Sequence, residues 1–341
     1  MHKLNVLVAG STGYIGIQLI KLLCKHDNIL IKYLCGNTSV GKKIAYFDKS
    51  LKNKRLPSIV RFNKSYLKKV DLIFTALPNG EAQDISKKLL KNNTLIDLAA
   101  DFRLKSANLY LKWYKQKHRA VYNIKKSIYS LPEITQDKIK NYNIISCPGC
   151  YPTSILLPLI PLIKKKLINC NNIIIDSKSG YSGAGKKFDL NNIKNSENLN
   201  FYNYNTNSHR HICEIQQELK KYTKELINFS FNPHILPIYR GMMSTIYCDL
   251  QDEVYYKDLY NTLSSFSKDL TFVNFLDDNG KADFFSVQNT NNCLIKLYKH
   301  HSDTKIIVVS LIDNLLKGAA GQAVQCLNII LNLDEKLALN I

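Results

Sequence analysis

Apolar positions in the first half of the chain predict strands that alternate with helices. Residues 4–9 form an apolar run of the length of a buried strand, and apolar positions at helical spacing follow as far as Leu23. Further strand-like runs lie at 30–34, 70–76 and 94–98, with a helix expected over 81–91. Alternation of this kind favours a parallel sheet, so we predict an α/β protein that begins with a Rossmann-type parallel sheet domain.

The pattern changes in the second half. Strand-like segments lie at 229–238, 243–250, 271–275, 293–299 and 305–311, the last four around one helix. They predict a second domain of α+β type with a mixed sheet. A segment rich in small residues, 313–323, reads as a helix that packs against the first domain. We expect a first domain of residues 1–148 completed by 313–341, and a second domain of residues 149–312.

The strand at 4–9 leads into a glycine-rich turn. Gly10 permits a tight turn, Gly13 lets the backbone approach a pyrophosphate, and Gly16 allows the helix to pack closely. The candidate cofactor-binding residues are those of the whole turn, Gly10, Ser11, Thr12, Gly13, Tyr14, Ile15 and Gly16. We predict a dinucleotide site, and a glycine-rich turn without a ligand is the alternative.

Residues after the second strand bear on which dinucleotide binds. An NAD site favours an acidic residue there to hold the ribose hydroxyls, but none occurs between Asp27 and Asp48. The segment instead carries Thr38, Ser39 and Lys42, which suit a ribose 2′-phosphate. The sequence therefore favours NADP(H), with an ordinary solvated loop as the alternative reading of Lys42.

A cysteine is expected at the start of a helix. Residues 142–146 read as a short strand, Pro148 and Gly149 end it, and a helical pattern follows, which places Cys150 at the helix N-terminus. The helix dipole favours the thiolate by roughly 0.3–1 kcal/mol, which is less than one pKa unit, so a basic partner is also needed. We predict a nucleophile. The alternatives are a buried structural cysteine, or a redox or zinc role for the C-x-x-C motif formed with Cys147.

Two histidines are the candidate bases for this thiol. His209 and His211 flank Arg210 ahead of an amphipathic segment, and an imidazole is the usual partner of a catalytic cysteine. Surface histidines, or a pair of metal ligands, are the alternatives.

Two arginines and one loop are candidates for holding an anionic substrate. Arg103 follows the carboxyl end of a strand and could clamp a phosphate, or form a salt bridge to Asp101. Arg240 is a candidate for a substrate carboxylate. The loop that contains Ser182 and Gly183 offers backbone donors to an anion, and a flexible linker is its alternative reading.

Composition narrows the classes of protein. The formal net charge is +20, but the basic residues are mostly lysines spread along the chain, which argues against a dedicated nucleic-acid surface. Nine cysteines without a secretory leader favour reduced thiols and a cytoplasmic location. No apolar run is long enough to span a bilayer, so we expect a soluble protein without a membrane partner.

Taken together, these segments resemble the N-acetyl-gamma-glutamyl-phosphate reductase family, which is related to aspartate-semialdehyde dehydrogenase. The resemblance covers nearly the whole chain and rests on motifs in a fixed order: GSTGYIG at 10–16, DFRL at 101–104, PGCYPT at 148–153, SGYSGAGK at 179–186, HRH at 209–211, RG at 240–241 and DNLLKGAAGQAVQ at 313–325. The chain departs from the family at Cys147, which creates the C-x-x-C motif, and at Lys186, where an arginine is usual.

The resemblance implies an arginine-biosynthetic reaction in which Cys150 attacks N-acetyl-L-glutamyl 5-phosphate. A thioester forms, and NADPH reduces it to N-acetyl-L-glutamate 5-semialdehyde. It further implies proton transfer by His211 or His209, a phosphate site at Arg103, a carboxylate site at Arg240 and a cofactor contact at Asn314.

By the same resemblance, the second domain carries catalysis and builds a homodimer or homotetramer. The alternatives are a related acyl-phosphate reductase, acting on aspartyl or aminoadipyl phosphate, and a Rossmann protein that senses NADP without turnover. The residues that decide the acyl chain length cannot be identified from the sequence.

Overall fold

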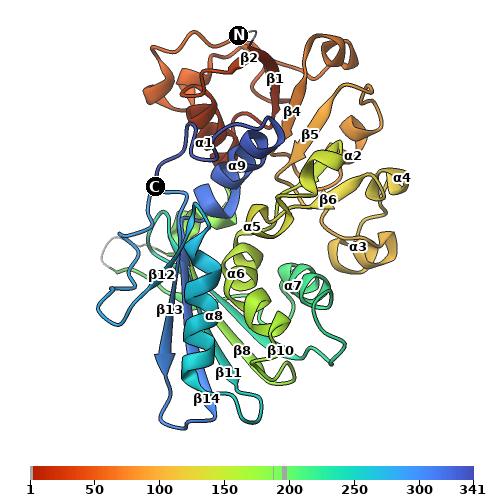
Figure 1. Cartoon of the computed structure of the whole chain (residues 1–341). Helices are drawn as coiled ribbons and strands as arrows, with labels where there is room; N and C mark the ends of the chain where they lie inside the picture. The colour runs from red at the N-terminus through yellow and green to blue at the C-terminus, as the bar shows by residue number, and fades with distance from the viewer. Residues whose placement is uncertain (1–2, 187, 194–197) are drawn as a thin grey trace. The chain divides into compact units, whose positions relative to one another are not determined.

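The computed structural model describes residues 3–186, 188–193 and 198–341, and these form two compact units. Unit 1 runs to Gly149 and regains the chain at Ala319–Asn340, whereas unit 2 consists mainly of Cys150–Gly318 (Figure 1). No helix among the described residues is long and apolar enough to cross a membrane.

Unit 1 is built on a seven-stranded sheet whose neighbouring strands all pair in parallel. In spatial order the strands are β3 (Ile59–Val60), β2 (Ile29–Cys35), β1 (Leu4–Ala9), β4 (Leu72–Thr75), β5 (Thr94–Asp97), β7 (Ile144–Ser146) and β6 (Ser127–Tyr129). From β1 the sheet grows first to one side, through β2 and β3, and then to the other side, through β4 and β5, as in a doubly wound nucleotide-binding fold. The predicted Rossmann-type sheet is confirmed.

Helices of unit 1 come from both ends of the chain. They are α1 (Tyr14–Leu23), α2 (Glu81–Ser86), α3 (Ala107–Tyr114), α4 (Val121–Ile124), α5 (Pro132–Thr135) and α9 (Gly321–Ile330). Figure 1 shows α9 beside α1, and the two helices are in contact. The helix expected over 81–91 is shorter than predicted and ends at Ser86. From Lys88 onward the backbone hydrogen bonds join residues three apart instead of four, such as the 2.9 Å bond from the Lys88 N–H to the Ile85 oxygen.

Unit 2 contains a second seven-stranded sheet in which parallel and antiparallel pairs are mixed. Its strands, in spatial order, are β12 (Val273–Leu276), β13 (Cys293–Lys299), β14 (Lys305–Ile312), β11 (Met242–Asp249), β8 (Ile173–Gly180), β10 (Phe229–Leu236) and β9 (Tyr202–Asn203). The predicted mixed sheet is confirmed.

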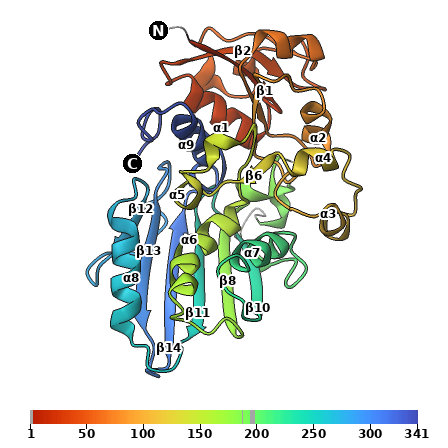
Figure 2. The same ribbon diagram turned by 45° about the vertical axis from the view of Figure 1, so that its right-hand side comes forward.

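One face of this sheet carries the helices of unit 2. These are α6 (Cys150–Lys164), α7 (His211–Leu219) and α8 (Tyr256–Lys268), which lie side by side across the strands (Figure 2). The helix α6 is in the middle and is buried from Tyr151 to Ile163. Its burial fixes the position of its first residue, Cys150.

Candidate active site

Cys150 is the first residue of α6, directly after the turn that ends unit 1. The backbone of Gly318 lies against it: a Cβ added to Gly318 would lie 2.7 Å from the Cβ of Cys150. Only a glycine fits there without displacing the cysteine. Gly318 therefore sets the position of the thiol, a role that the sequence motif around it did not reveal.

Both candidate histidines pack around the residue that follows the cysteine. The ring of Tyr151 makes edge contacts with His209 and His211, at centroid distances of 5.4 and 5.9 Å, and the two imidazoles lie 4.6 Å apart. His211 is the first residue of α7, which packs against α6. The structure therefore gathers His209 and His211 around Tyr151, the residue that directly follows Cys150.

The two imidazoles differ in their surroundings. Burial, with a smaller contribution from Arg210, lowers the pKa of His209 to about 4, so its ring is neutral at pH 7. Its Nδ1 accepts the backbone N–H of His211 at 3.1 Å, which leaves the proton of the neutral ring on Nε2. The Nε2 of His211 instead lies 3.8 Å from the Oε1 of the fully buried Glu214. An imidazolium at His211 thus has a carboxylate to stabilise it.

Two tyrosine hydroxyls complete the cluster and were not identified from the sequence. The hydroxyl of Tyr204 donates to that of Tyr151 at 3.2 Å. Burial, with a smaller contribution from negative charge on Cys150, raises the pKa of Tyr204 to about 12. Burial also raises the pKa of Tyr151, with Cys150 again contributing. Both hydroxyls stay protonated and lie within electrostatic reach of the thiolate.

A second group of predicted residues meets at Asn314. Its side-chain oxygen accepts the backbone N–H of Gly241 at 2.9 Å, and its amide nitrogen donates to the hydroxyl of Ser182 at 2.9 Å. A Cβ on Gly183 would lie 3.5 Å from the same amide nitrogen. Asn314 therefore ties the Ser182–Gly183 loop to the Arg240–Gly241 turn.

Arg240 is held by a buried carboxylate. Its Nε lies 3.2 Å from Asp313, whose side chain is fully buried. Burial raises the pKa of Asp313, and the charge of Arg240 opposes that rise. The guanidinium also donates to the side chain of Asn289. One side of the guanidinium is thereby fixed, which orients the group.

In unit 1, the glycine turn has the geometry expected of a dinucleotide-binding turn. Gly10 has a φ of +83°, and a Cβ there would lie 2.2 Å from the carbonyl oxygen of Ala76. A Cβ on Gly16 would lie 2.2 Å from the oxygen of Gly10, so the helix packs directly on the turn. At Gly13, the N-cap of α1, an added Cβ would lie 3.7 Å from its nearest neighbour, the oxygen of Gly10. Gly13 therefore leaves room for a ligand to approach the backbone.

A cavity of about 260 Å³ lies at this turn. Its walls include Gly10, Gly36, Asn37, Arg61 and Leu77. The Gly-rich backbone and the ends of β1 and β2 at this cavity fit a nucleotide, which binds at the carboxyl ends of parallel strands.

The predicted phosphate-binding residues after β2 differ in exposure, and none of them lines the cavity. Ser39 is buried, with 6% of its surface exposed, whereas Thr38 and Lys42 are exposed. The ammonium of Lys42 lies 4.6 Å from the ring centroid of Tyr46. Two cations line the cavity, Arg61 and Lys88, and the sequence analysis singled out neither of them.

Arg103 is buried at the carboxyl end of the unit 1 sheet. Its guanidinium donates to the carbonyl oxygens of Cys147 and Leu98, at 2.9 and 3.0 Å. The Asp101 carboxylate accepts the backbone N–H of Gly80 at 2.6 Å and the hydroxyl of Tyr110 at 2.8 Å. These bonds orient both side chains.

Cys147 has surroundings unlike those of Cys150. It is fully buried, and a hydrogen bond with Cys326, together with burial, raises its pKa well above the ordinary value.

All nine cysteines are free thiols. Among the described residues, no group of three or more His, Cys, Asp or Glu side chains is arranged to hold a metal.

Two family profiles divide the chain in the same way as its units. Residues 5–142 match the family described as semialdehyde dehydrogenase, NAD binding domain, and residues 150–314 match semialdehyde dehydrogenase, dimerisation domain. Both domains of the chain are thus those of the semialdehyde dehydrogenase class of oxidoreductases, which uses a nicotinamide cofactor.

Sequence relatives define the family more narrowly. The chain is 42% identical over 342 residues to the N-acetyl-gamma-glutamyl-phosphate reductase of Clostridium beijerinckii, covering 100% of this chain and 98% of the relative. It is 41% identical to the protein of that name from Ehrlichia canis, covering 99% and 98%. The chain belongs to the N-acetyl-gamma-glutamyl-phosphate reductase family.

Solved structures confirm the fold. Aspartate semialdehyde dehydrogenase II from Vibrio cholerae superposes with a TM-score of 0.71 at 16% identity, covering 97% of this chain and 99% of that one. The aspartate semialdehyde dehydrogenase with NADP from Candida albicans gives a TM-score of 0.69 at 16% identity, covering 98% and 99%. The fold class predicted from the sequence is therefore confirmed.

Proposed function

We propose that this protein catalyses the NADPH-dependent reduction of N-acetyl-L-glutamyl 5-phosphate to N-acetyl-L-glutamate 5-semialdehyde and phosphate, a step of arginine biosynthesis. The observation that carries the proposal is the placement of Cys150 at the start of α6, beside a cluster that contains two imidazoles. The family to which the chain belongs supports the choice of substrate.

The thiolate of Cys150 attacks the acyl carbonyl carbon, and the bond to phosphate breaks to leave a thioester on the sulfur. Backbone N–H groups in the first turn of α6, with the positive end of the helix dipole, stabilise the oxyanion that forms during this attack. A nicotinamide cofactor supplies the hydride that reduces the thioester. Breakage of the carbon–sulfur bond then releases the aldehyde and restores the cysteine.

His211 is the proposed proton-transfer residue, because Glu214 lies 3.8 Å from its Nε2 and stabilises the imidazolium that forms when the ring takes the proton of the thiol. His209 is less suited to this role, since a ring with a pKa of about 4 is too weak a base to hold the proton of the thiol near pH 7. It remains the second candidate, and its bond to the His211 backbone suits it to a positioning role.

Substrate groups are assigned to the remaining predicted residues. Arg103 takes the phosphate and Arg240 the substrate carboxylate, with Ser182 and Gly183 beside the acyl chain. Asn314 contacts the cofactor and also joins the two substrate segments of unit 2. The fixed orientation of Arg240 on Asp313 supports a bidentate contact with a carboxylate.

NADP(H) is the proposed cofactor, and Arg61 is a stronger candidate for its 2′-phosphate than Lys42. Arg61 lines the cavity at the glycine turn, whereas Lys42 lies over the ring of Tyr46. Thr38 and Ser39 remain candidates for hydrogen bonds to the same phosphate. A planar guanidinium suits a phosphate because it donates two parallel hydrogen bonds.

We also propose a homodimer or homotetramer built on the sheet of unit 2. Register across four strands aligns Ile174, Tyr247, Ile307 and Tyr298 as direct neighbours on one face. Ile174, Tyr247 and Tyr298 expose 45%, 39% and 38% of their surface, so this row is an apolar patch on the chain taken alone. Replacing Tyr247 with Asp should dissociate the oligomer, as measured by light scattering. An unchanged mass would exclude this face.

The decisive assay runs in the reverse direction, because acyl phosphates hydrolyse readily. Reduction of NADP in the presence of inorganic phosphate is followed with N-acetylglutamate, aspartate and aminoadipate semialdehydes in turn. Fastest turnover with the first supports the proposal, and fastest turnover with either of the others assigns the chain to a sister activity. Binding of NADP without turnover of any of the three would indicate a nucleotide sensor.

A further inference from the structure

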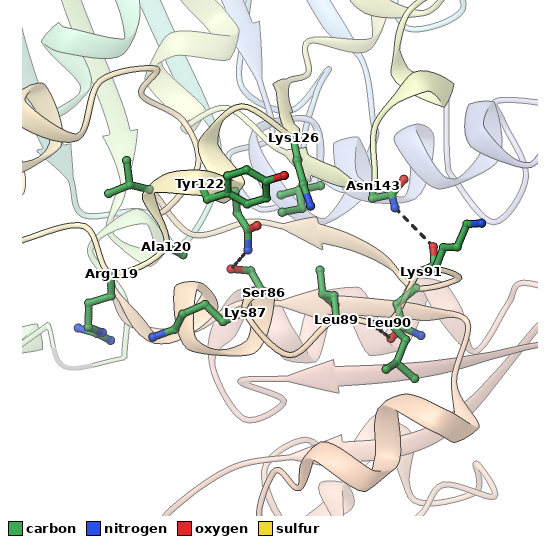
Figure 3. Close-up of a pocket in the computed structure, with 14 residues that line it drawn as sticks. Ser86, Lys87, Leu89, Leu90, Lys91, Arg119, Ala120, Tyr122, Lys126 and Asn143 are labelled. Atoms are coloured by element: carbon green, nitrogen blue, oxygen red, sulfur yellow. Dashed lines mark hydrogen bonds between the residues drawn. The ribbon is translucent and has the colours of Figure 1, made fainter.

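A second cavity in unit 1, of about 660 Å³, lies away from the glycine turn. The segment that follows α2 forms one wall, the residues of α4 form the opposite wall, and the start of β7 closes one end. Figure 3 shows Tyr122 and Lys126 on one side, facing Lys87 and Leu89 on the other. Its volume is in the range of cavities that bind small organic molecules.

All of the charged side chains that line this cavity are basic. Four basic side chains line it, Lys87, Lys91, Arg119 and Lys126, and none of the lining residues is acidic. In the part of the chain that the structure describes, their ion pairs are made with one carboxylate, Asp84, which binds Lys87 at 2.8 Å and Arg119 at 2.7 Å. The cavity therefore has an excess of positive charge.

The remaining lining supplies apolar and polar contacts. Leu89, Leu90 and Val121 are apolar, and Tyr122 exposes 72% of its surface beside the ammonium of Lys126, which lies 4.4 Å from its ring centroid. The side-chain amide of Asn123 donates to the hydroxyl of Ser86 at 2.9 Å, and this bond holds two of the lining residues together. A flat or apolar body would pack on these side chains while its acidic groups meet the lysines.

We propose that this cavity binds a small organic anion that carries at least one carboxylate, phosphate or sulfonate on a flat or apolar body. The site is distinct from the nucleotide cavity, since the two cavities share no lining residue. Nothing in the proposed reaction uses it.

The helix α2 contributes residues to the walls of both cavities. Arg119, which lines the second cavity, donates to the carbonyl oxygen of Gly80 at 2.6 Å and to Asp84. Asp84 also lines the nucleotide cavity, together with Glu81. An anion that draws Arg119 or Lys87 away from Asp84 changes the charge at that wall of the nucleotide cavity. Occupancy of the second cavity therefore alters nucleotide affinity.

The test uses 8-anilinonaphthalene-1-sulfonate, a fluorescent organic anion, on the full-length protein with the nucleotide cavity filled by excess NADPH. Wild type should bind the probe saturably. Lys126→Glu should weaken binding by about tenfold or more, because it reverses a charge inside the cavity. Lys125→Glu is the matched control, since it makes the same change of net charge at a neighbouring position that does not line the cavity. It should change affinity by less than about twofold.

Two results would overturn the site: equal weakening by the two substitutions, or a probe dissociation constant that keeps rising in proportion to the NADPH concentration, as for competition at one shared site. The link to the nucleotide cavity is measured as the dissociation constant of NADPH with and without saturating probe. A shift in wild type that disappears in Lys126→Glu supports the link, and an unchanged constant in wild type refutes it. Circular dichroism of both variants confirms that they are folded.

Discussion

In unit 1 the candidate cofactor site is made of backbone, whereas in unit 2 the candidate catalytic site is made of side chains packed on one tyrosine. Gly10 and Gly16 are required because a Cβ would collide with neighbouring carbonyl oxygens. Around Cys150 the requirement is for particular functional groups, the two imidazoles that contact Tyr151. The backbone site is therefore sensitive to any Cβ added at its glycines. The side-chain site is sensitive to the loss of particular functional groups.

The largest effect is expected from the cysteine itself. Cys150→Ser should lower turnover by roughly a thousandfold or more, because a hydroxyl is a far weaker nucleophile at neutral pH, while NADPH binding should stay near wild type. Cys147→Ser is the matched control, because this buried thiol takes no part in the proposed reaction. Steady-state rates and NADPH titrations measure both. Comparable losses in the two variants would contradict the assignment of the nucleophile.

The units should also respond to acid in opposite directions. The pKa of His209 in unit 2 is lowered to about 4 by burial. Between pH 6.5 and about 4 the unfolded chain binds a proton that the folded chain does not, so this histidine reduces stability as pH falls, by up to about 3 kcal/mol. In unit 1, burial and then Asp101 raise the pKa of Asp97 to about 7. Asp97 therefore contributes stability at low pH that is lost as pH rises through about 7.

Urea unfolding at several pH values separates these contributions. His209→Asn keeps an acceptor for the His211 N–H and removes the titration, so stability should fall less steeply below pH 6.5 than in wild type. Asp97→Asn should remove the loss of stability between about pH 4 and 7. Parallel pH profiles for wild type and both variants would show that neither group is shifted as described.

Gly318 allows a backbone constraint to be tested next to a side-chain site. An added Cβ would lie 2.7 Å from the Cβ of Cys150, so Gly318→Ala must move the thiol. A misplacement of about 1 Å can cost on the order of a hundredfold in rate, and we expect a loss of that size in kcat. The affinity for NADPH should not change. The alkylation rate of Cys150 by iodoacetamide gives an independent measure, and wild-type values of both rates would rule out the positioning role.

The fold was predictable because it follows from long periodic segments, whereas parts of the site depend on contacts that no local pattern contains. The strand at 293–299 and the elbow at Cys150 were read correctly from apolar spacing and turn residues. Tyr204 reaches Tyr151 from 53 positions away along the chain, through the tertiary fold alone. Arg61 follows a strand of two residues, which is too short to show a period.

The smallest effect is expected from Arg61. It completes the comparison, because it is a side chain at the cofactor site of unit 1, which is otherwise made of backbone. Arg61→Ala should weaken NADPH by about tenfold and leave NADH nearly unchanged, because only NADPH carries the 2′-phosphate that the guanidinium would bind. Lys42→Ala is the rival, and its cation lies over the Tyr46 ring instead of in the cavity. Titrations of both variants with both cofactors decide between them. Selective loss of NADPH in Lys42→Ala alone would return the role to the loop after β2, and equal loss of both cofactors in Arg61→Ala would assign Arg61 to the adenosine that they share.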